Sequence, residues 1–344
     1  MTAATTLRYA PPAPRRTLRA TSADGAVLHV EDHGPADGPA VVLAHGWTCS
    51  TAFWSPVVRS LTAEGHRVVV YDQRGHGRSA PADPSVYSTG TLADDLCAVL
   101  DTVLGPGERA VVGGHSMGAM TLMAAAGRPR LGERAAAVLL CNTGPSRLVA
   151  ESRVLPLPAG RLRTFLHRRL LGTGAPLGPV TPVSRRLVKH GTMGAASTPE
   201  QVEACARLVH ACPRKVRAAW SHVLDTLDVE ADLARLNVPT AVVSGGSDRL
   251  TPPVHGRRIA DALPQCTGLT ELPGRGHMTP VEDPDAVAGV LAALVRDHLA
   301  PVASGEPSAR VPGPRPAAET AAETVPGTAN TPAPPQQQIE EESA

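Results

Sequence analysis

One serine lies in a pattern that is typical of a catalytic nucleophile. Residues 114–118 read GHSMG, so Ser116 stands two residues from a glycine on either side. An apolar run at 110–112 precedes the motif, and a helical pattern follows it at 117–126. This strand–turn–helix context predicts a sharp turn that lifts the serine hydroxyl above the end of the strand. Both glycines are expected because strand and helix cross too closely there for side chains. The alternative is a glycine-rich turn in which the serine has no chemical role.

A serine hydroxyl is a weak nucleophile unless a base lies beside it and an acid orients that base. Asp248 is the only acid of the loop GGSDRLTP at 245–252, which follows an apolar run. His277 lies 29 residues further on, in the glycine-flanked loop GRGHM, after another apolar run. The order serine, acid, histidine is the one expected after a nucleophile turn of this kind. We therefore predict that Ser116 attacks, that His277 is its base and that Asp248 orients the imidazole.

Asp248 and His277 both have simpler explanations. An aspartate in a loop often only forms a turn, and the chain contains 13 histidines. His298, on the helix expected at 284–299, is the weaker alternative for the base. The loop after the preceding strand reads NTG at 142–144 and offers no competing acid. The positions of Asp248 and His277 directly after consecutive strands favour the catalytic assignment.

Attack on a carbonyl group produces an oxyanion, which fixed N–H donors must stabilise. The backbone N–H of Met117, next to the nucleophile, is the first candidate. The second is the backbone N–H of Trp47, in the segment HGW at 45–47 that follows an apolar run. The indole of Trp47 either lines an acyl pocket or belongs to the core. A further run, YDQRGHGRS at 71–79, is interpreted as a support for the loop behind the site.

The candidate residues are expected at one edge of a sheet, because apolar runs alternate with helical patterns along the chain. This alternation is typical of an α/β fold with a mostly parallel sheet and flanking helices. The expected strands lie at 17–20, 27–31, 41–44, 67–71, 110–112, 138–141, 240–244 and 269–272. The expected helices lie at 52–61, 91–104, 117–126 and 284–299. A hairpin is predicted at Asp24-Gly25, and a capping box at Thr91 and Asp94.

One long segment, 145–235, has no convincing strand, and prolines divide it into short helical patterns. Residues 150–222 contain 12 Lys or Arg and 3 Glu. This positive charge favours an acidic substrate or a lipid surface, or is simply a solvated basic face. The chain is therefore divided into a flexible leader at 1–16, a core at 17–144 and 236–300, a helical lid or cap at 145–235, and a disordered tail at 301–344.

The composition excludes several classes of function. A net charge of +1 argues against strong overall attraction to nucleic acid or anionic membranes, and 3 Trp, 3 Tyr and 2 Phe are too few for a base-stacking platform. The six cysteines form no CxxC pair, so neither a zinc nor a redox motif is expected, and free thiols indicate a reducing compartment. No secretory signal and no membrane-spanning apolar run is found. We therefore expect a cytoplasmic protein that has no transmembrane segment and binds no nucleic acid.

Taken in order, the motifs resemble those of the α/β-hydrolase fold superfamily. HGW, DQRGHGRS, GHSMG, GGSDRLTPP and GRGHM all match, and the resemblance covers about residues 20–299. It implies an eight-stranded, mostly parallel sheet whose first strands are antiparallel, a helical lid after the sixth strand, and catalysis without metal or cofactor. By the same resemblance, Ser116, Asp248 and His277 match the catalytic triad. Met117 and Trp47 match the oxyanion donors.

The motifs look most like the branch of serine esterases, lipases and cofactor-free haloperoxidases. Epoxide hydrolases and haloalkane dehalogenases are disfavoured, because they place an aspartate where this chain has Ser116, and because the lid contains no tyrosine. The expected function is hydrolysis of a small-molecule carboxylic ester through an acyl-enzyme. The alternatives are a thioester, an amide as in aminopeptidases, the carbon–carbon bond of a β-diketone, perhydrolysis, and a non-catalytic ligand receptor. The oligomeric state is left open. The expected substrate contacts are Trp47, Met117, Phe165, Met193 and Trp220.

Overall fold

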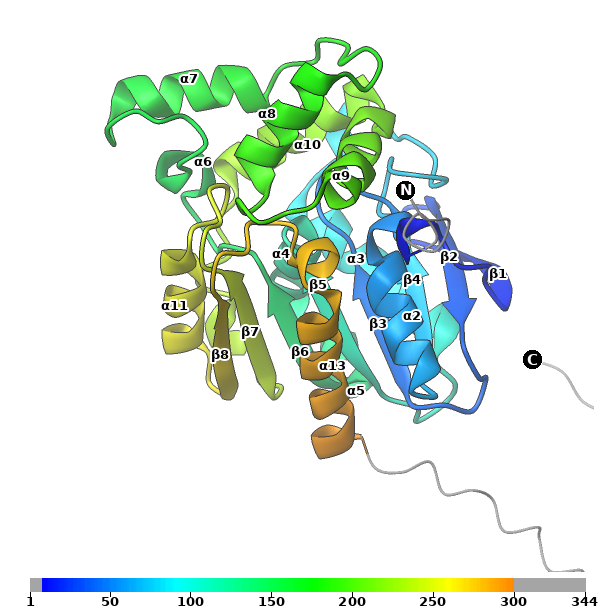
Figure 1. The fold of residues 1–344 in the computed structure, drawn as a ribbon. Coiled ribbons are helices and arrows are strands. Elements are labelled where there is room, and N and C mark those ends of the chain that lie inside the picture. Colours follow the sequence, from blue (N-terminus) through cyan, green and yellow to red (C-terminus); the bar gives the residue numbers. More distant parts are fainter. Residues whose placement is uncertain (1–7, 300–344) are drawn as a thin grey trace, which may run out of the picture. The chain divides into compact units, whose positions relative to one another are not determined.

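An eight-stranded sheet forms the centre of the computed structural model, which describes residues 8–299 (Figure 1). The strands are β1 (Arg16–Thr21), β2 (Val27–His33), β3 (Ala40–Ala44), β4 (Arg67–Tyr71), β5 (Ala110–His115), β6 (Ala135–Cys141), β7 (Thr240–Gly245) and β8 (Cys266–Leu272). Their order in the sheet is β1-β2-β4-β3-β5-β6-β7-β8. Strand β2 runs antiparallel to both neighbours, and every pair from β4 to β8 is parallel. The expected α/β fold with a mostly parallel sheet is confirmed.

Helices cover both faces of the sheet. The main covering helices are α2 (Ser55–Ala63) and α13 (Pro284–His298) on one face, and α3 (Thr89–Val103), α4 (Met117–Ala124) and α11 (Pro253–Ala262) on the other. The shorter elements are α5 (Pro129–Arg134), α12 (Thr279–Glu282), η1 (Thr51–Trp54), η2 (Pro84–Val86), η3 (Ala125–Gly127) and η4 (Leu233–Arg235). Val41 packs on the side of α2 and α13, whereas its neighbour Val42 packs on the side of α3 and α4. Burial on both faces explains why the central strands are continuous apolar runs.

The expected elements are present, with shifts at their ends. The strand expected at 110–112 continues to His115, the residue before the serine of the motif. The helix expected from residue 91 begins at Thr89, because Ser88 is its N-cap. The Ser88 Oγ accepts a hydrogen bond from the Thr91 N–H at 3.1 Å, and the Thr91 Oγ1 accepts one from the Ser88 N–H at 3.0 Å. The capping box predicted from Thr91 is therefore wrong in position, because several hydroxyl residues in a row fit the same pattern.

Between β6 and β7 the chain forms a helical insertion, which lies over the carboxyl ends of the parallel strands (Figure 1). Its helices are α6 (Leu148–Glu151), α7 (Arg161–Leu171), α8 (Pro182–Thr192), α9 (Pro199–Ala211) and α10 (Arg214–Thr226). The extended pairing that the structure shows within this insertion is an isolated bridge between Ser146 and Asp228. The insertion occupies the segment in which a helical cap was expected, and its action as a lid stays a prediction.

The described part of the leader, residues 8–15, is held against the core. The Arg8 guanidinium pairs with Asp285 at 3.0 Å, and the Ala10 carbonyl oxygen accepts a hydrogen bond from Arg59 at 2.9 Å. Single side chains make these contacts in a segment that has no hydrophobic periodicity, and the flexibility expected of the leader stays a prediction. Residues 1–7 and the expected tail at 301–344 lie outside the described residues.

In the part of the chain that the structure describes, thiols and other potential metal ligands form no cluster. All six cysteines are free, and burial raises the pKa of Cys97 and of Cys212 to about 11, so these two thiols stay protonated at neutral pH. Within residues 8–299, no group of three or more His, Cys, Asp or Glu side chains could hold a metal ion. Over the same residues, no helix combines the length and the apolar character needed to cross a membrane.

Candidate functional site

Ser116 occupies a strained turn between β5 and α4. Its backbone has φ of 53° and ψ of −118°, a conformation that is rare for residues other than glycine. The two glycines of the motif make the crossing possible. A Cβ added at Gly118 would overlap the carbonyl group of Ala44, and one added at Gly114 would lie 2.5 Å from the Ala119 nitrogen. The turn therefore places Ser116 at the carboxyl end of a central strand, as the motif predicted.

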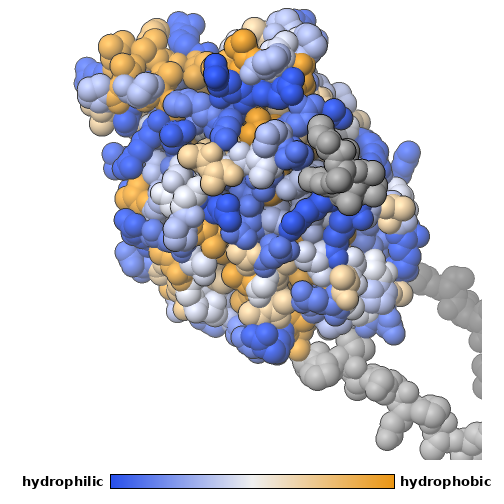
Figure 2. Space-filling model, viewed as in Figure 1, coloured by the Kyte–Doolittle hydropathy of each residue, from blue (hydrophilic) through white to orange (hydrophobic). Residues whose placement is uncertain are grey.

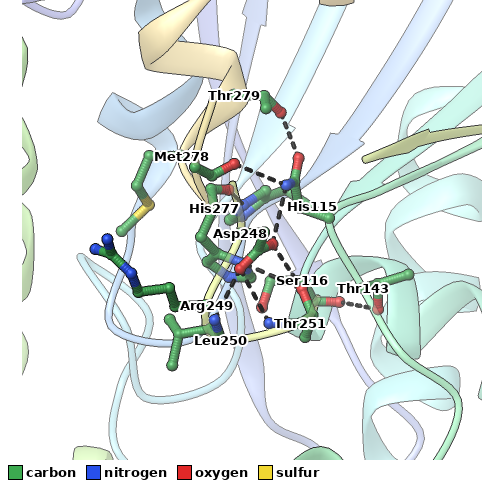
Figure 3. A network of polar contacts seen from close by, with 12 residues as sticks. His115, Ser116, Thr143, Asp248, Arg249, Leu250, Thr251, His277, Met278 and Thr279 are labelled. Atoms are coloured by element: carbon green, nitrogen blue, oxygen red, sulfur yellow. Dashed lines mark hydrogen bonds and ion pairs between the residues drawn. The ribbon is translucent and has the colours of Figure 1, made fainter. Parts of the chain in front are cut away.

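His277 and Asp248 are in direct contact at the same edge of the sheet (Figure 3). The His277 Nδ1 and the Asp248 Oδ2 lie 2.8 Å apart, and both side chains are buried. Asp248 belongs to the loop after β7, and His277 to the loop after β8. These strands are adjacent and parallel, so their carboxyl ends lie side by side. The structure thus brings together the acid and the base that were paired from the sequence.

Further donors surround the Asp248 carboxylate. Its Oδ1 accepts hydrogen bonds from the N–H groups of Leu250 at 2.8 Å and Thr251 at 3.0 Å. Its Oδ2 accepts from the Thr251 hydroxyl at 2.9 Å and from the Asn142 amide at 3.0 Å. Burial by itself raises the pKa of Asp248. The His277 imidazole and these donors lower the pKa by a larger amount, so the net pKa lies below the usual range. An ionised Asp248 attracts the N–H at Nδ1 of the imidazole, which leaves Nε2 as a proton acceptor.

Asn142 is a site residue that was not selected from the sequence. It follows β6 with a left-handed φ of 46°. Its side-chain NH₂ donates to Asp248 at 3.0 Å and to the Gly276 carbonyl oxygen at 3.1 Å, so it ties the acid to the loop that carries His277. The segment 142–144 was considered only as a place for a competing acid. The available signal was a polar amide directly after a buried strand.

Ser116 and His277 line the same cavity, which has a volume of about 440 Å³. The residue before the serine also links the two loops, because the His115 Nε2 lies 2.8 Å from the His277 carbonyl oxygen. Trp47 forms part of another wall. The remaining wall is largely aliphatic and comes mainly from the cap, including Leu148, Val149, Leu155, Leu170, Leu171, Leu187 and Val188. The cavity is therefore a mainly apolar chamber whose wall includes Ser116 and the imidazole of His277, which Asp248 holds.

The two backbone N–H groups proposed as oxyanion donors belong to segments that adjoin this serine. Met117 is the first residue of α4, and Trp47 lies in the loop after β3. That loop approaches the serine so closely that a Cβ added at Gly46 would lie 3.1 Å from the Ser116 Cβ. Among residues 8–299, neither the Met117 N–H nor the Trp47 N–H donates to another group. Both donors therefore remain available to a bound oxygen atom.

The segment 71–79 supports the Trp47 loop from behind. Burial lowers the pKa of His45 to about 4, so its imidazole is neutral. The His45 Nε2 accepts a hydrogen bond from the Gln73 N–H at 3.0 Å, and Nδ1 donates to the Gly46 carbonyl oxygen at 2.7 Å. These contacts agree with the interpretation of 71–79 as a structural support.

Three of the expected substrate contacts do not line the cavity. Phe165 is 51% exposed on the outer face of α7, Met193 is buried in the core on the α2 and α13 side, and Trp220 is fully buried with its indole N–H on a backbone carbonyl group. These predictions were wrong because large apolar side chains of a helical cap also fill outer surfaces and core contacts. Trp47 does line the cavity. The Met117 side chain is buried against the cap, so only its backbone can reach a substrate.

Glu282 is a second residue that was missed, and it holds the loop of His277. Its buried carboxylate accepts hydrogen bonds from the N–H groups of Gly276 at 3.0 Å and Met278 at 3.1 Å, which flank the histidine. It also accepts from the Gly194 N–H at 2.8 Å, in the segment after α8. The histidine loop is therefore fastened to the cap through one carboxylate. No sequence pattern marked this acid, which resembles an ordinary surface residue at the start of a helix.

The chain is similar to known proteins over most of its length. A family model described as "Alpha/beta hydrolase family" matches residues 41–290. A Variovorax paradoxus protein named as the carbamate hydrolase RutD is 31% identical over 283 residues, which are 80% of this chain and 97% of that protein. The non-heme chloroperoxidase of Streptomyces lividans is 30% identical over 266 residues, covering 72% of this chain and 86% of that protein. The solved structure of a thermophilic esterase from Thermogutta terrifontis has a TM-score of 0.67 at 26% identity and covers 82% of this chain and 99% of its own. The reactions in these names differ, so the likeness does not select a substrate.

Proposed function

Because the chain belongs to the alpha/beta hydrolase family, and is thus an enzyme of the hydrolase class, we propose that it cleaves a carboxylic ester through an acyl-enzyme formed on Ser116. The observation that carries this proposal is the buried contact of 2.8 Å between His277 Nδ1 and Asp248 Oδ2, at the cavity that also contains Ser116. A histidine oriented in this way can take a proton from a hydroxyl and return it to a leaving group.

In the proposed reaction, the Ser116 Oγ bonds to the ester carbonyl carbon while its proton passes to His277 Nε2. The ionised Asp248 stabilises the resulting imidazolium. The oxyanion accepts hydrogen bonds from the N–H groups of Met117 and Trp47. It collapses as the ester C–O bond breaks, and the alcohol leaves with the proton from the histidine. A water molecule then attacks the acyl group by the same path, which releases the acid and restores the serine hydroxyl.

The cavity favours a small ester with an apolar part. Its volume of about 440 Å³ is typical of a site for a small molecule, and its walls are largely aliphatic. We propose that the cap at 145–235 acts as a lid on the core of 17–144 and 236–300. Its role is to exclude water from the chamber while the oxyanion is present.

Hydrolysis of a carbamate is a second candidate. It is favoured by the Variovorax paradoxus relative, which is matched over 97% of its length and is named as a carbamate hydrolase. The same serine would attack the carbamate carbonyl carbon, and His277 would give its proton to the departing group. The carbamate carbonyl is less electrophilic than that of an ester, because the nitrogen lone pair delocalises into it.

A substrate panel separates these candidates. It contains p-nitrophenyl acetate, butyrate and octanoate, an acyl thioester, and an N-alkyl carbamate, each compared with the Ser116→Ala variant as a baseline. We expect kcat/KM for the best ester to exceed that for the thioester and the carbamate by at least about tenfold. A carbamate that is turned over fastest would replace the ester proposal. Equal rates for wild type and Ser116→Ala on every compound would reject an acyl-enzyme altogether.

The Glu282→Gln variant is expected to have a kcat about 10- to 100-fold lower, with little change in KM. The amide presents an NH₂ group to at least one of the N–H donors that now bond to the carboxylate, so the loop of His277 must shift. The free energy of unfolding should also fall, by about 1–3 kcal/mol. Steady-state kinetics on the best ester, together with urea unfolding, check both effects.

Glu271→Gln is the matched control for this experiment. Glu271 is a residue of β8 that pairs with Arg257 at 2.6 Å on the surface, and it does not line the cavity. We expect its kcat to equal that of wild type. A folded Glu282→Gln variant with wild-type kcat would show that the carboxylate only stabilises the fold and does not position the histidine.

A further inference from the structure

The outer face of the cap carries an apolar surface. On α7, Leu162 is 67% exposed, Phe165 51% and Leu170 48%. On α8, Val183 and Leu187 are 68% and 66% exposed. These five residues are called the cap patch. Figure 2 shows hydrophobic colour gathered at the upper left, over the region of α7. The two helices are linked at the cavity, whose wall includes both Leu170 and Leu187. Exposed large apolar side chains that gather in one region commonly mark a binding surface.

The apolar face of α7 is held outward by contacts on its other side. His167 is buried beneath the helix, and its Nε2 accepts a hydrogen bond from the Leu155 N–H at 2.9 Å. Arg168 pairs with Asp225 on α10 at 2.8 Å. A surface helix normally turns its polar face to solvent and its apolar face to the core. In α7 a polar histidine faces the protein while leucines and a phenylalanine face outward, which is the arrangement of a helix with a second, apolar partner.

The segment that bears the cap patch is strongly basic. Residues 152–199 contain seven Arg, one Lys and no Asp or Glu. Arg161, Arg169 and Arg186 are exposed, and none of them forms a salt bridge within residues 8–299. The Arg169 guanidinium lies over the Phe165 ring, 5.3 Å from its centroid. The whole chain has a net charge of only +1, but the segment around these apolar residues has a local excess of positive charge.

The cap patch shares two residues with the wall of the cavity. Leu170 and Leu187 belong to the cap patch and also line the cavity that contains Ser116. Leu177, which is 39% exposed, lines it as well. Any surface that covers the cap patch would therefore also meet the cavity.

We propose that the cap patch docks onto an anionic phospholipid surface, with its apolar side chains among the acyl chains and its arginines at the headgroup phosphates. Basic amphipathic helices lie in the membrane interface in this way, and guanidinium groups pair with phosphate oxygens. A second copy of the chain is a poorer partner, because a symmetric dimer through this face would bring the same unpaired arginines against one another. Docking requires no turnover, so this proposal and the proposed ester hydrolysis stand or fall separately.

Co-sedimentation of the full-length protein with sucrose-loaded vesicles tests this proposal. We expect binding to phosphatidylcholine vesicles that contain about one third phosphatidylglycerol, weak binding to pure phosphatidylcholine, and weaker binding in about 0.5 M salt. The Leu162→Asp/Phe165→Asp variant should lower the partition coefficient at least about tenfold. The Arg161→Glu/Arg186→Glu variant should lower it about fivefold or more for each arginine.

Val254→Asp is the matched control, because Val254 is 39% exposed on α11 and lies outside the cap patch. It should bind vesicles as wild type does, and circular dichroism should show that every variant is folded. If the double aspartate variant does not fold, the arginine variant decides the question, since it alters only exposed side chains. Equal binding to neutral and anionic vesicles, or wild-type binding by either double variant, would overturn the proposal. So would a dimer that the aspartate variant dissociates, combined with wild-type protein that does not bind vesicles.

Discussion

Ester turnover by the Ser116→Ala variant is expected to fall by at least about 10⁴-fold in kcat. The change removes the single atom that forms the covalent bond to the acyl group. The fold should be retained, because alanine adopts the strained backbone of this turn at the same cost as serine. Hydrolysis of p-nitrophenyl butyrate and thermal unfolding measure the two quantities.

Ser60→Ala is the matched control for this variant. Ser60 is a partly exposed residue of α2, and its hydroxyl bonds to Asp285 at the surface. We expect full activity from the control. If Ser116→Ala retains more than about a hundredth of the wild-type kcat, the hydrolysis does not pass through this serine.

The Asp248→Asn variant is expected to lose about 10³- to 10⁴-fold in kcat/KM. Its Oδ1 would keep the two backbone N–H donors of the loop, which turns the new NH₂ group toward Thr251, Asn142 and His277. The imidazole must then accept a hydrogen bond at Nδ1 and carry its proton on Nε2. In that form it cannot take a proton from Ser116.

The low pKa of Asp248 adds a prediction about acid stability. Because its pKa in the folded state lies below the usual carboxyl value, the ionised group stabilises the fold above a pH of about 4, and this contribution is lost as the pH falls through the folded-state pKa. Asp248→Asn should lack this part of the acid destabilisation in thermal unfolding. Asp225→Asn, which alters a partly exposed ion pair with Arg168, is the control. It should keep the wild-type activity and the wild-type loss of stability at low pH. Activity of Asp248→Asn within about tenfold of wild type would assign Asp248 a structural role only.

The positions of Ser116, Asp248 and His277 at one sheet edge could be predicted, because each stands in a short motif directly after an apolar run. Such runs locate the ends of buried strands, and neighbouring parallel strands bring their ends together. The same reasoning located β4, whose span Arg67–Tyr71 is the one expected. Each of these signals lies within a few neighbouring residues, so it can be read from the sequence alone.

The supporting residues could not be predicted, because their roles consist of contacts between distant loops. Asn142 and Gly276 are 134 positions apart, and no sequence pattern near either residue indicates their hydrogen bond. The substrate contacts failed for a related reason. Whether Phe165 or Trp220 faces a cavity depends on how each short helix rotates against the core. In α7 the face that turns inward carries the buried His167, contrary to the usual apolar pattern.

The most direct test is to identify the residue that a fluorophosphonate modifies, by peptide mass spectrometry. We expect one adduct per chain, on the peptide that contains Ser116, and much slower labelling of His277→Ala, because the hydroxyl then lacks its base. An adduct on another residue, or equal labelling rates for wild type and His277→Ala, would contradict the claim that Ser116 is a nucleophile activated by His277.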